Sequence, residues 1–295
     1  MENLPIFLKN LLEKEYDEKK VDEIIKGYNL KRKTTFRLNT LKFSEDEILK
    51  RLDSLNVKYT KYPYLDNAYI TDIEAKDYLN TDIVKDGIIY FQSISSMLPA
   101  YFLGAKENET ILDMCAAPGG KTIVLAQLLN NKVEITSNEV NRIRFERLKH
   151  NLETLGVRSY LLNMDGLRLD DYFRFDKILL DAPCSGSGTL DLSNQKQMKS
   201  FSFELIKNSS LLQEKLLNKA LTILKPNSDM IYSTCSILED ENEKVLNKVL
   251  KKHNAKIVPI EMKNVPTLDT KIAGTLKVMP NELFEGFFIA KIHKN

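Results

Sequence analysis

The chain has 295 residues, of which 43% are hydrophobic and 28% charged, with a formal net charge of +2. This composition is typical of a soluble globular protein of one large or two modest domains, and no apolar run is long enough to cross a membrane. The three cysteines form no C-x-x-C pair and there are only three histidines, so we expect no disulfide framework, no metal site and a cytoplasmic location.

The first part of the chain, residues 1–86, predicts a small α+β module. Residues 1–10 lack the apolar stretch of a secretory signal. Gly27 is expected to end a helix, and Ser44 followed by Glu47 is the capping box that opens another. The predicted elements are two helices, a strand, a helix and two strands, in residues 4–28, 34–42, 44–55, 57–60 and 68–73.

Basic and aromatic residues gather in this module. Together they could follow a phosphate backbone and stack a base, although each basic residue could equally belong to a solvated face. The candidates are Tyr28, Lys31, Arg32, Lys33, Phe36, Arg37 and Lys42.

Strands and helices alternate in the second part, residues 87–295. Residues 87–98 begin as a strand and become helical before Pro99. Further strands are expected at residues 110–112, 133–137, 160–164, 177–180 and 230–233, with helices at 123–129, 142–155, 205–224 and 239–252. The alternation predicts an α/β fold, a Rossmann-like domain with a mainly parallel sheet between helices.

Residues 110–122, T-I-L-D-M-C-A-A-P-G-G-K-T, read as a buried strand, a tight loop and a helix start, with Pro118 in the first helical turn. Exposed N–H groups at such a helix start favour an anionic or carboxylate-bearing ligand. The end of the stretch resembles a phosphate-binding P-loop, but Cys115 stands where that motif needs glycine, and G-x-G-x-x-G is absent. A ligand without a pyrophosphate, such as S-adenosylmethionine, suits the loop better.

Four acidic residues lie at or just beyond the ends of predicted strands, where ligands bind in open α/β sheets: Asp113, Glu139, Asp165 and Asp181. Each alone would more often be a helix cap or a turn residue. Glu139 lies about twenty residues after Gly119, the spacing at which an acid reaches ribose hydroxyls. Asp165 would suit an adenine amino group. The four together favour a nucleoside-type ligand.

Two cysteines, Cys184 and Cys235, follow the ends of two of these strands. One such cysteine would more often be packed in the core, but two at cleft-forming strand ends favour covalent catalysis. Thiolate attack on carbon 6 of a pyrimidine makes carbon 5 nucleophilic, so that carbon 5 can take a methyl group from a sulfonium. Spacing does not decide which cysteine attacks, and Cys115 is expected to be structural.

The chain resembles the Nop/Sun (Fmu) family of S-adenosylmethionine-dependent RNA cytosine-5 methyltransferases over nearly its whole length from Arg37. The matching motifs are R-L-N-T-L-K at 37–42, D-M-C-A-A-P-G-G-K-T at 113–122, N-E with a later arginine at 138–144, M-D-G at 164–166, D-A-P-C-S-G-S-G at 181–188, Y-S-T-C-S at 232–236 and E-G-F-F-I-A at 285–290.

The resemblance implies roles that spacing leaves open. It implies that Cys235 attacks the cytosine, that Cys184 assists release of the product, and that Lys121 and Asp181 contact the target base. It further implies a set of residues that bind S-adenosylmethionine. These are Cys115, Ala116, Ala117, Pro118, Gly119, Gly120, Lys121, Glu139, Arg144, Asp165 and Asp181.

Lys277 and Asn281 depart from the resemblance, because the family usually has arginine and histidine there. The sequence also ends soon after Ala290, so we expect no C-terminal RNA-binding domain, and residues 1–86 to bind RNA. A compact member of this kind favours tRNA as the substrate, with rRNA as the alternative, and we expect a monomer. Two other readings stay open: a catalytically idle RNA-binding assembly protein, and an oxidoreductase or NTPase on a similar sheet.

Overall fold

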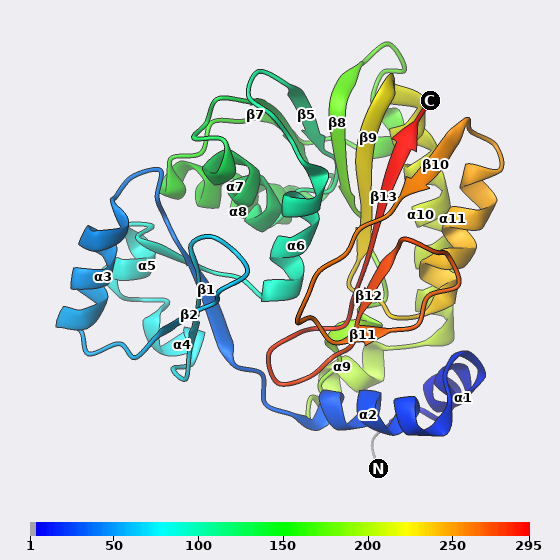
Figure 1. Ribbon diagram of the computed structural model, residues 1–295, viewed down its shortest axis with the longest axis horizontal. Coiled ribbons are helices and arrows are strands. Elements are labelled where there is room, and N and C mark those ends of the chain that lie inside the picture. The colour runs from blue at the N-terminus through cyan, green and yellow to red at the C-terminus, as the bar shows by residue number, and fades with distance from the viewer. Residues whose placement is uncertain (1–3) are drawn as a thin grey trace.

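The structure is a computed structural model that describes residues 4–295. Residues 1–3, the beginning of the stretch considered as a signal above, lie outside the described residues. Among residues 4–295, no helix combines the length and the apolar character needed to cross a membrane. Two sheets organise the chain, a small antiparallel one and a large, mainly parallel one (Figure 1).

The small sheet has four strands in the order β2 (Thr60–Lys61), β3 (Ala68–Thr71), β1 (Thr34–Leu38) and β4 (Ile89–Phe91). All of its pairings are antiparallel. The helices beside it are α3 (Glu45–Ser54), α4 (Ala75–Tyr78) and α5 (Asp82–Lys85). The predicted capping box is confirmed, because the Ser44 side chain accepts from the Glu47 backbone N–H and the Glu47 carboxylate accepts from the Ser44 N–H.

The large sheet has nine strands. The path of eight runs β11 (Thr267–Leu268), β12 (Leu276–Val278), β13 (Phe287–Lys294), β9 (Leu224–Thr234), β8 (Phe175–Asp181), β5 (Thr110–Asp113), β6 (Glu134–Asn138) and β7 (Tyr160–Leu162), and β10 (Ala255–Val258) pairs with β13. Strands β5 to β9 are parallel, whereas β13 joins β9 in the antiparallel sense. After β5 the chain adds β6 and β7 on one side of β5, and then β8 and β9 on the other side. This change of side creates a ligand-binding edge at the carboxyl ends of the strands.

Helices cover both faces of the large sheet. They are α6 (Ile94–Leu103), α7 (Gly120–Leu128), α8 (Arg142–Leu155), α10 (Phe203–Ile223) and α11 (Glu243–Leu250). The remaining short elements of this part are α9 (Gln195–Ser200) and the 3₁₀ turns η1 (Gly166–Arg168), η2 (Ser187–Thr189) and η3 (Glu239–Glu241). Neighbouring residues of a strand point to opposite faces, so Ile111 packs with α6 and α7 while Leu112 packs with α10 and α11. The expected α/β fold with a small α+β module is confirmed.

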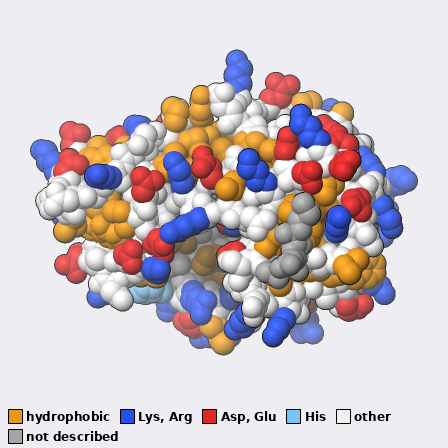
Figure 2. Space-filling view, turned by 90° about the horizontal axis from the view of Figure 1, so that it is seen from below, with side chains coloured by type: hydrophobic (Ala, Val, Ile, Leu, Met, Phe, Trp, Pro, Cys, Tyr) orange, Lys and Arg blue, Asp and Glu red, His pale blue; other side chains and the backbone are white. Residues whose placement is uncertain are grey.

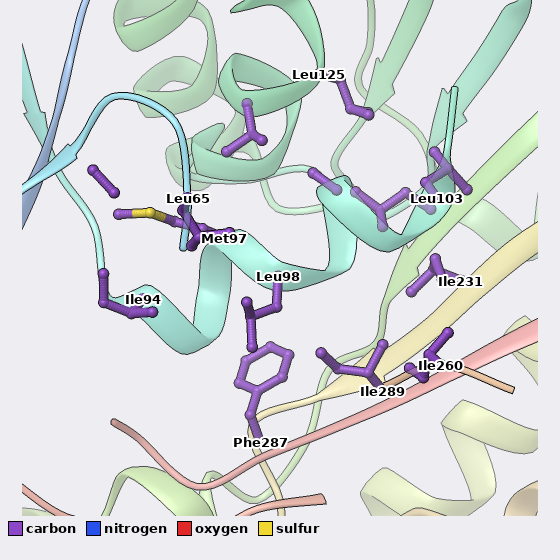
Figure 3. Close-up of a cluster of buried hydrophobic side chains, with 14 of the residues drawn as sticks. Leu65, Ile94, Met97, Leu98, Leu103, Leu125, Ile231, Ile260, Phe287 and Ile289 are labelled. Atoms are coloured by element: carbon purple, nitrogen blue, oxygen red, sulfur yellow. The ribbon is translucent and has the colours of Figure 1, made fainter. Parts of the chain in front are cut away.

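Helix α6 packs against the sheet with its apolar side. Figure 3 shows Leu98 and Leu103 of this helix beside Ile231 of β9 and Ile289 of β13, with Leu125 of α7 close by. Because Ser93 caps the helix and Ser96 lies in its first turn, this packing fixes two hydroxyl groups at the edge of the large sheet.

Helices α1 (Ile6–Glu15) and α2 (Glu18–Asn29) lie away from the small sheet, below α9 and β11 in Figure 1. Their apolar residues form one cluster with Leu190, Phe201 and Ile237 of the second part of the chain. Strand β4, in turn, extends the small sheet beyond the predicted boundary at residues 86 and 87. We therefore propose residues 34–91 as the small module, with α1 and α2 joining the larger part.

Two expectations about helix ends are wrong. Gly27 lies inside α2, where a Cβ would stand 2.1 Å from the Pro280 carbonyl oxygen, so close packing rather than a helix end explains it. Pro118 precedes α7, whose N-cap is Gly119 at a φ of 112°.

Candidate active site

A cavity of about 230 Å³, called the main cavity below because it contains the predicted loop, opens at the carboxyl ends of β5 and β8. One wall is the loop that the sequence singled out, and the other is the segment joining β4 to α6. The lining residues are Tyr90, Phe91, Gln92, Ser93, Ser96, Asp113, Cys115, Ala116, Ala117, Pro118, Gly120, Lys121, Asp181 and Glu285. All predicted residues of the loop except Gly119 therefore face this cavity.

Lys121 and Asp181 form a fixed ion pair in the cavity wall. Lys121 is 8% exposed, and its Nζ donates to Asp181 Oδ2 at 2.7 Å and to Ser96 Oγ at 2.8 Å. The other Asp181 oxygen accepts from Ser233 Oγ at 2.7 Å. Since each partner has a second hydrogen bond, both head groups have one defined orientation toward the cavity.

Asp113 contributes a buried carboxylate to the same cavity. Its Oδ2 accepts from Thr122 Oγ1 at 2.7 Å, whereas Oδ1 has no hydrogen-bond partner. Burial raises the pKa of Asp113 to about 7, and the hydrogen bond from Thr122 and the charge of Lys121 only partly oppose this rise. A buried, unpartnered carboxylate oxygen is costly, so it indicates a ligand that donates a hydrogen bond there.

We expect Asp113→Asn to be more stable than the wild type at pH 8 and equally stable at pH 4. Between pH 3.8 and about 7 the native Asp113 keeps a proton that the unfolded chain has lost, so wild-type stability falls as the pH rises through this window. The shift corresponds to at most about 4 kcal/mol in the free energy of unfolding. Urea unfolding at both pH values measures it, with the exposed Asp72→Asn as the control; parallel pH curves for all three proteins would contradict the assignment.

A second cavity, of about 70 Å³, lies next to the first and shares Cys115 with it. Its walls include Glu139 and Asp165 at the ends of β6 and β7, together with apolar side chains. Glu139 is 2% exposed, and its carboxylate accepts from Asn141 N at 2.9 Å and pairs with Arg144 NH1 at 3.4 Å. Arg144 also donates to Ala117 O at 2.6 Å, which links this cavity to the loop of the first.

The two later cysteines meet at the carboxyl ends of β8 and β9. The Sγ atoms of Cys184 and Cys235 are 2.7 Å apart, both residues are free thiols, and both are partly exposed. Neither lines the main cavity, but Asp181 connects them to it from the end of β8. The hydrogen bond with Cys235 and burial raise the pKa of Cys184 well above its ordinary value. Burial likewise raises the pKa of Cys115, as expected for a structural thiol.

Three of the residues proposed to contact a nucleic acid are wrong. Tyr28, Phe36 and Arg37 are each 1% exposed, so they cannot stack on a base or contact a phosphate. Residues 35–38 of β1 are all buried, so both faces of this strand are covered.

The other basic candidates lie at the surface, and some have protein partners. Lys31 pairs with Glu74, Arg32 donates to the Leu190 carbonyl, and Lys42 donates to the carbonyls of Asp86 and Thr154. On the face shown in Figure 2, basic side chains are interspersed with acidic ones rather than gathered alone.

Lys277 and Asn281, which depart from the family pattern, have structural partners. Lys277 is 1% exposed, and its Nζ lies 2.8 Å from Glu243 Oε1 and 3.1 Å from the Tyr16 hydroxyl. The Asn281 side chain accepts from the N–H groups of Leu283 and Phe284. These two residues therefore hold the chain near α1 and before β13.

Sequence reasoning missed Ser96, Ser233, Glu241 and Glu285 as parts of the site. Ser96 and Glu285 lie in the cavity wall, Ser233 orients Asp181, and Glu241 is a buried carboxylate between the cysteine loops. Ser233 and Glu285 fall inside quoted motifs, which was the available signal. In the described part of the chain, no group of three or more His, Cys, Asp or Glu residues is arranged to hold a metal ion.

Comparison with known proteins gives a consistent set of relatives. Residues 100–293 match the family model of the 16S rRNA methyltransferases RsmB/F. Ribosomal RNA small subunit methyltransferase F of Vibrio cholerae is 33% identical over 271 residues, which cover 88% of this chain and 57% of that protein. The corresponding protein of Aeromonas salmonicida is 31% identical, with 93% and 60% covered. The chain thus spans little more than half the length of these relatives.

Two solved structures from Pyrococcus horikoshii match the whole chain. A methyltransferase homolog protein is 32% identical with a TM-score of 0.79, and the match covers 99% of this chain and 100% of that one. NSun6, solved with SFG, has a TM-score of 0.89 at 23% identity and 99% coverage of both chains. The second likeness confirms the fold.

Proposed function

Since the chain belongs to the RsmB/F family of S-adenosylmethionine-dependent RNA cytosine-5 methyltransferases, we propose that it transfers a methyl group to carbon 5 of a cytosine in RNA. The resemblance to the Nop/Sun family is thereby confirmed. The observation that carries the proposal is the pair of thiols, Cys184 and Cys235, 2.7 Å apart beside the Lys121–Asp181 pair.

Covalent chemistry explains why a thiol is needed. A solvent base takes the proton of the Cys235 thiol, the thiolate sulfur bonds to carbon 6 of the cytosine, and the electrons of the C5–C6 double bond move to carbon 5. Carbon 5 then takes the methyl group. When the carbon 5 proton leaves to a solvent base, the double bond forms again and the bond from carbon 6 to Cys235 breaks. We propose that Lys121 and Asp181, joined by a 2.7 Å hydrogen bond, hold the polar edge of the ring.

S-adenosylmethionine, when bound, supplies an electrophilic methyl group on its sulfonium. The residues of the site fit this cofactor, because the unpartnered Asp113 Oδ1 can accept a hydrogen bond from its ammonium group. Within the loop at residues 115–121, the N–H groups of Ala116 and Gly119 donate to backbone carbonyls, and the other N–H groups suit its carboxylate. Glu139 and Asp165, in the second cavity, would accept from the ribose hydroxyls and the adenine amino group, with Arg144 and Cys115 beside them.

We propose rRNA of the small ribosomal subunit as the substrate. The curated relatives bear the name of small-subunit rRNA methyltransferases and give no support to the expected preference for tRNA. Family membership likewise gives no support to an oxidoreductase or an NTPase.

The test is methyl transfer from labelled S-adenosylmethionine to small-subunit rRNA and to tRNA, followed by nucleoside mass spectrometry. We expect 5-methylcytidine in the rRNA. Label in tRNA alone would overturn the choice of RNA. RNA binding without methylation of any cellular RNA would instead support an assembly protein without catalytic activity.

A further inference from the structure

Glu241 places a buried carboxylate between the loops that carry the two cysteines. It is 0% exposed, and it accepts hydrogen bonds from Ser185 N at 2.7 Å, Ser185 Oγ at 2.5 Å, Ser236 Oγ at 2.7 Å and Gln213 Nε2 at 3.3 Å. An ionised carboxylate has room for about four such bonds, so its capacity is used on these donors. All four are uncharged groups, and three of them belong to Ser185 and Ser236, which each adjoin a cysteine in the sequence.

The loop of Cys184 depends on this carboxylate. The backbone N–H and the hydroxyl of Ser185 both donate hydrogen bonds to Glu241. On the other side of Cys184, the Pro183 carbonyl accepts from Gln213 Nε2 at 2.8 Å, and Gln213 also donates to Glu241. Glu241 therefore holds Ser185 directly, and it holds Pro183 through Gln213. These are the two neighbours of Cys184.

The loop of Cys235 has further attachments that do not involve the Glu241 side chain. Asn242 Nδ2 donates to the Ser236 carbonyl at 2.9 Å, and its Oδ1 accepts from Thr234 Oγ1 at 2.6 Å. The Cys235 carbonyl accepts from Gly188 N at 2.9 Å. Loss of the carboxylate would therefore displace Cys184 more than Cys235.

We propose that Glu241 is a positioning residue for Cys184, holding its S–H against the Cys235 sulfur so that this sulfur can leave the methylated cytosine. The inference rests on the proposed function. In the release step, the carbon 5 proton passes to a solvent base, the C5–C6 double bond forms, and the C6–S bond breaks with its electron pair on Cys235. The S–H of Cys184 donates a hydrogen bond to that departing thiolate.

The electrostatics of the two thiols support these separate roles of Cys184 and Cys235. The hydrogen bond with Cys235 and burial raise the pKa of Cys184, and the charge of Glu241 adds to the rise. Cys184 therefore keeps its proton at neutral pH, as a hydrogen-bond donor must.

The decisive variant is Glu241→Asp, which keeps the charge but shortens the side chain by one C–C bond, about 1.5 Å. It cannot reach Ser185 and Ser236 together, so we expect the covalent protein–RNA complex to accumulate on the order of tenfold over the wild type. The KM for S-adenosylmethionine should stay within about twofold. Glu241→Gln keeps the length and an acceptor for Ser185 N, and should restore much of the release rate.

Asp176→Asn is the matched control. Asp176 also bridges elements through its carboxylate, accepting from Thr110 N, Thr110 Oγ1 and Lys225 Nζ at 3.0, 2.7 and 2.7 Å, but at the opposite ends of the strands. Asp176→Asn should lower the free energy of unfolding without accumulating the covalent protein–RNA complex. Should Glu241→Asp fail to fold, Gln213→Leu, which frees Pro183, should trap the complex in its place.

A folded Glu241→Asp that releases RNA at the wild-type rate, while Cys184→Ala traps it, would overturn the inference and leave the proposed function intact. If Gln213→Leu is used instead, its release of RNA at the wild-type rate would also overturn the inference. If the wild type forms no 5-methylcytidine in any RNA, the proposed function itself fails.

Discussion

Cys235→Ala is expected to lower methyl transfer to RNA by about 10⁴-fold or more, because the variant has no sulfur to attack carbon 6. Binding of S-adenosylmethionine should remain within about twofold, since Cys235 does not line the main cavity. Labelled methyl transfer measures the first effect, and isothermal titration with S-adenosylhomocysteine measures the second.

Ser228→Ala is the control for this variant, because Ser228 lies on the same strand, β9, at the end away from the thiols. It should methylate RNA at the wild-type rate. Retained activity in Cys235→Ala would show that another group attacks, and Cys184, 2.7 Å away, would then be the first candidate.

Cys184→Ala is expected to attack its RNA normally and then fail to release it. The variant keeps the Cys235 nucleophile but loses the thiol that lies against it, so turnover should stop after roughly one methyl group per protein molecule. The product should be a covalent protein–RNA complex that survives denaturing electrophoresis and carries the label.

The double variant Cys184→Ala, Cys235→Ala tests the linkage. It should give no complex, because the bond to RNA is made by Cys235. A complex in the double variant, or efficient multiple turnover in Cys184→Ala, would contradict the assigned roles.

The sequence predicted those features that depend on local chemistry. Short patterns predict the strand ends, the capping box of Ser44, and the positions of Asp113 and Lys121. The parallel order of the strands then brings Asp113 and Lys121 to one edge of the large sheet. The pairing of Cys184 with Cys235 was foreseeable only as a shared edge, and the structure adds their contact.

Features that depend on distant partners were not predictable. Arg37 is buried because both faces of β1 are covered, and Gly27 is a glycine because the chain at Pro280 passes against it. Glu241 falls in the helix predicted at 239–252 and has no pattern that marks it, since its donors Ser185 and Gln213 come from elsewhere in the chain. A short sequence pattern does not identify such contact partners, because the partners lie far away in the sequence.

The packing of α1 and α2 constrains the order in which this protein can be assembled during synthesis. The Tyr16 hydroxyl donates to the Ile237 carbonyl, 221 positions later, and Glu15 accepts from Glu239 N. Helices α1 and α2 therefore have no docking surface until the residues around Ile237 have also been made. Until then their apolar sides have no partner there, and the loop of Cys235 reaches its final support only when these two helices pack against it.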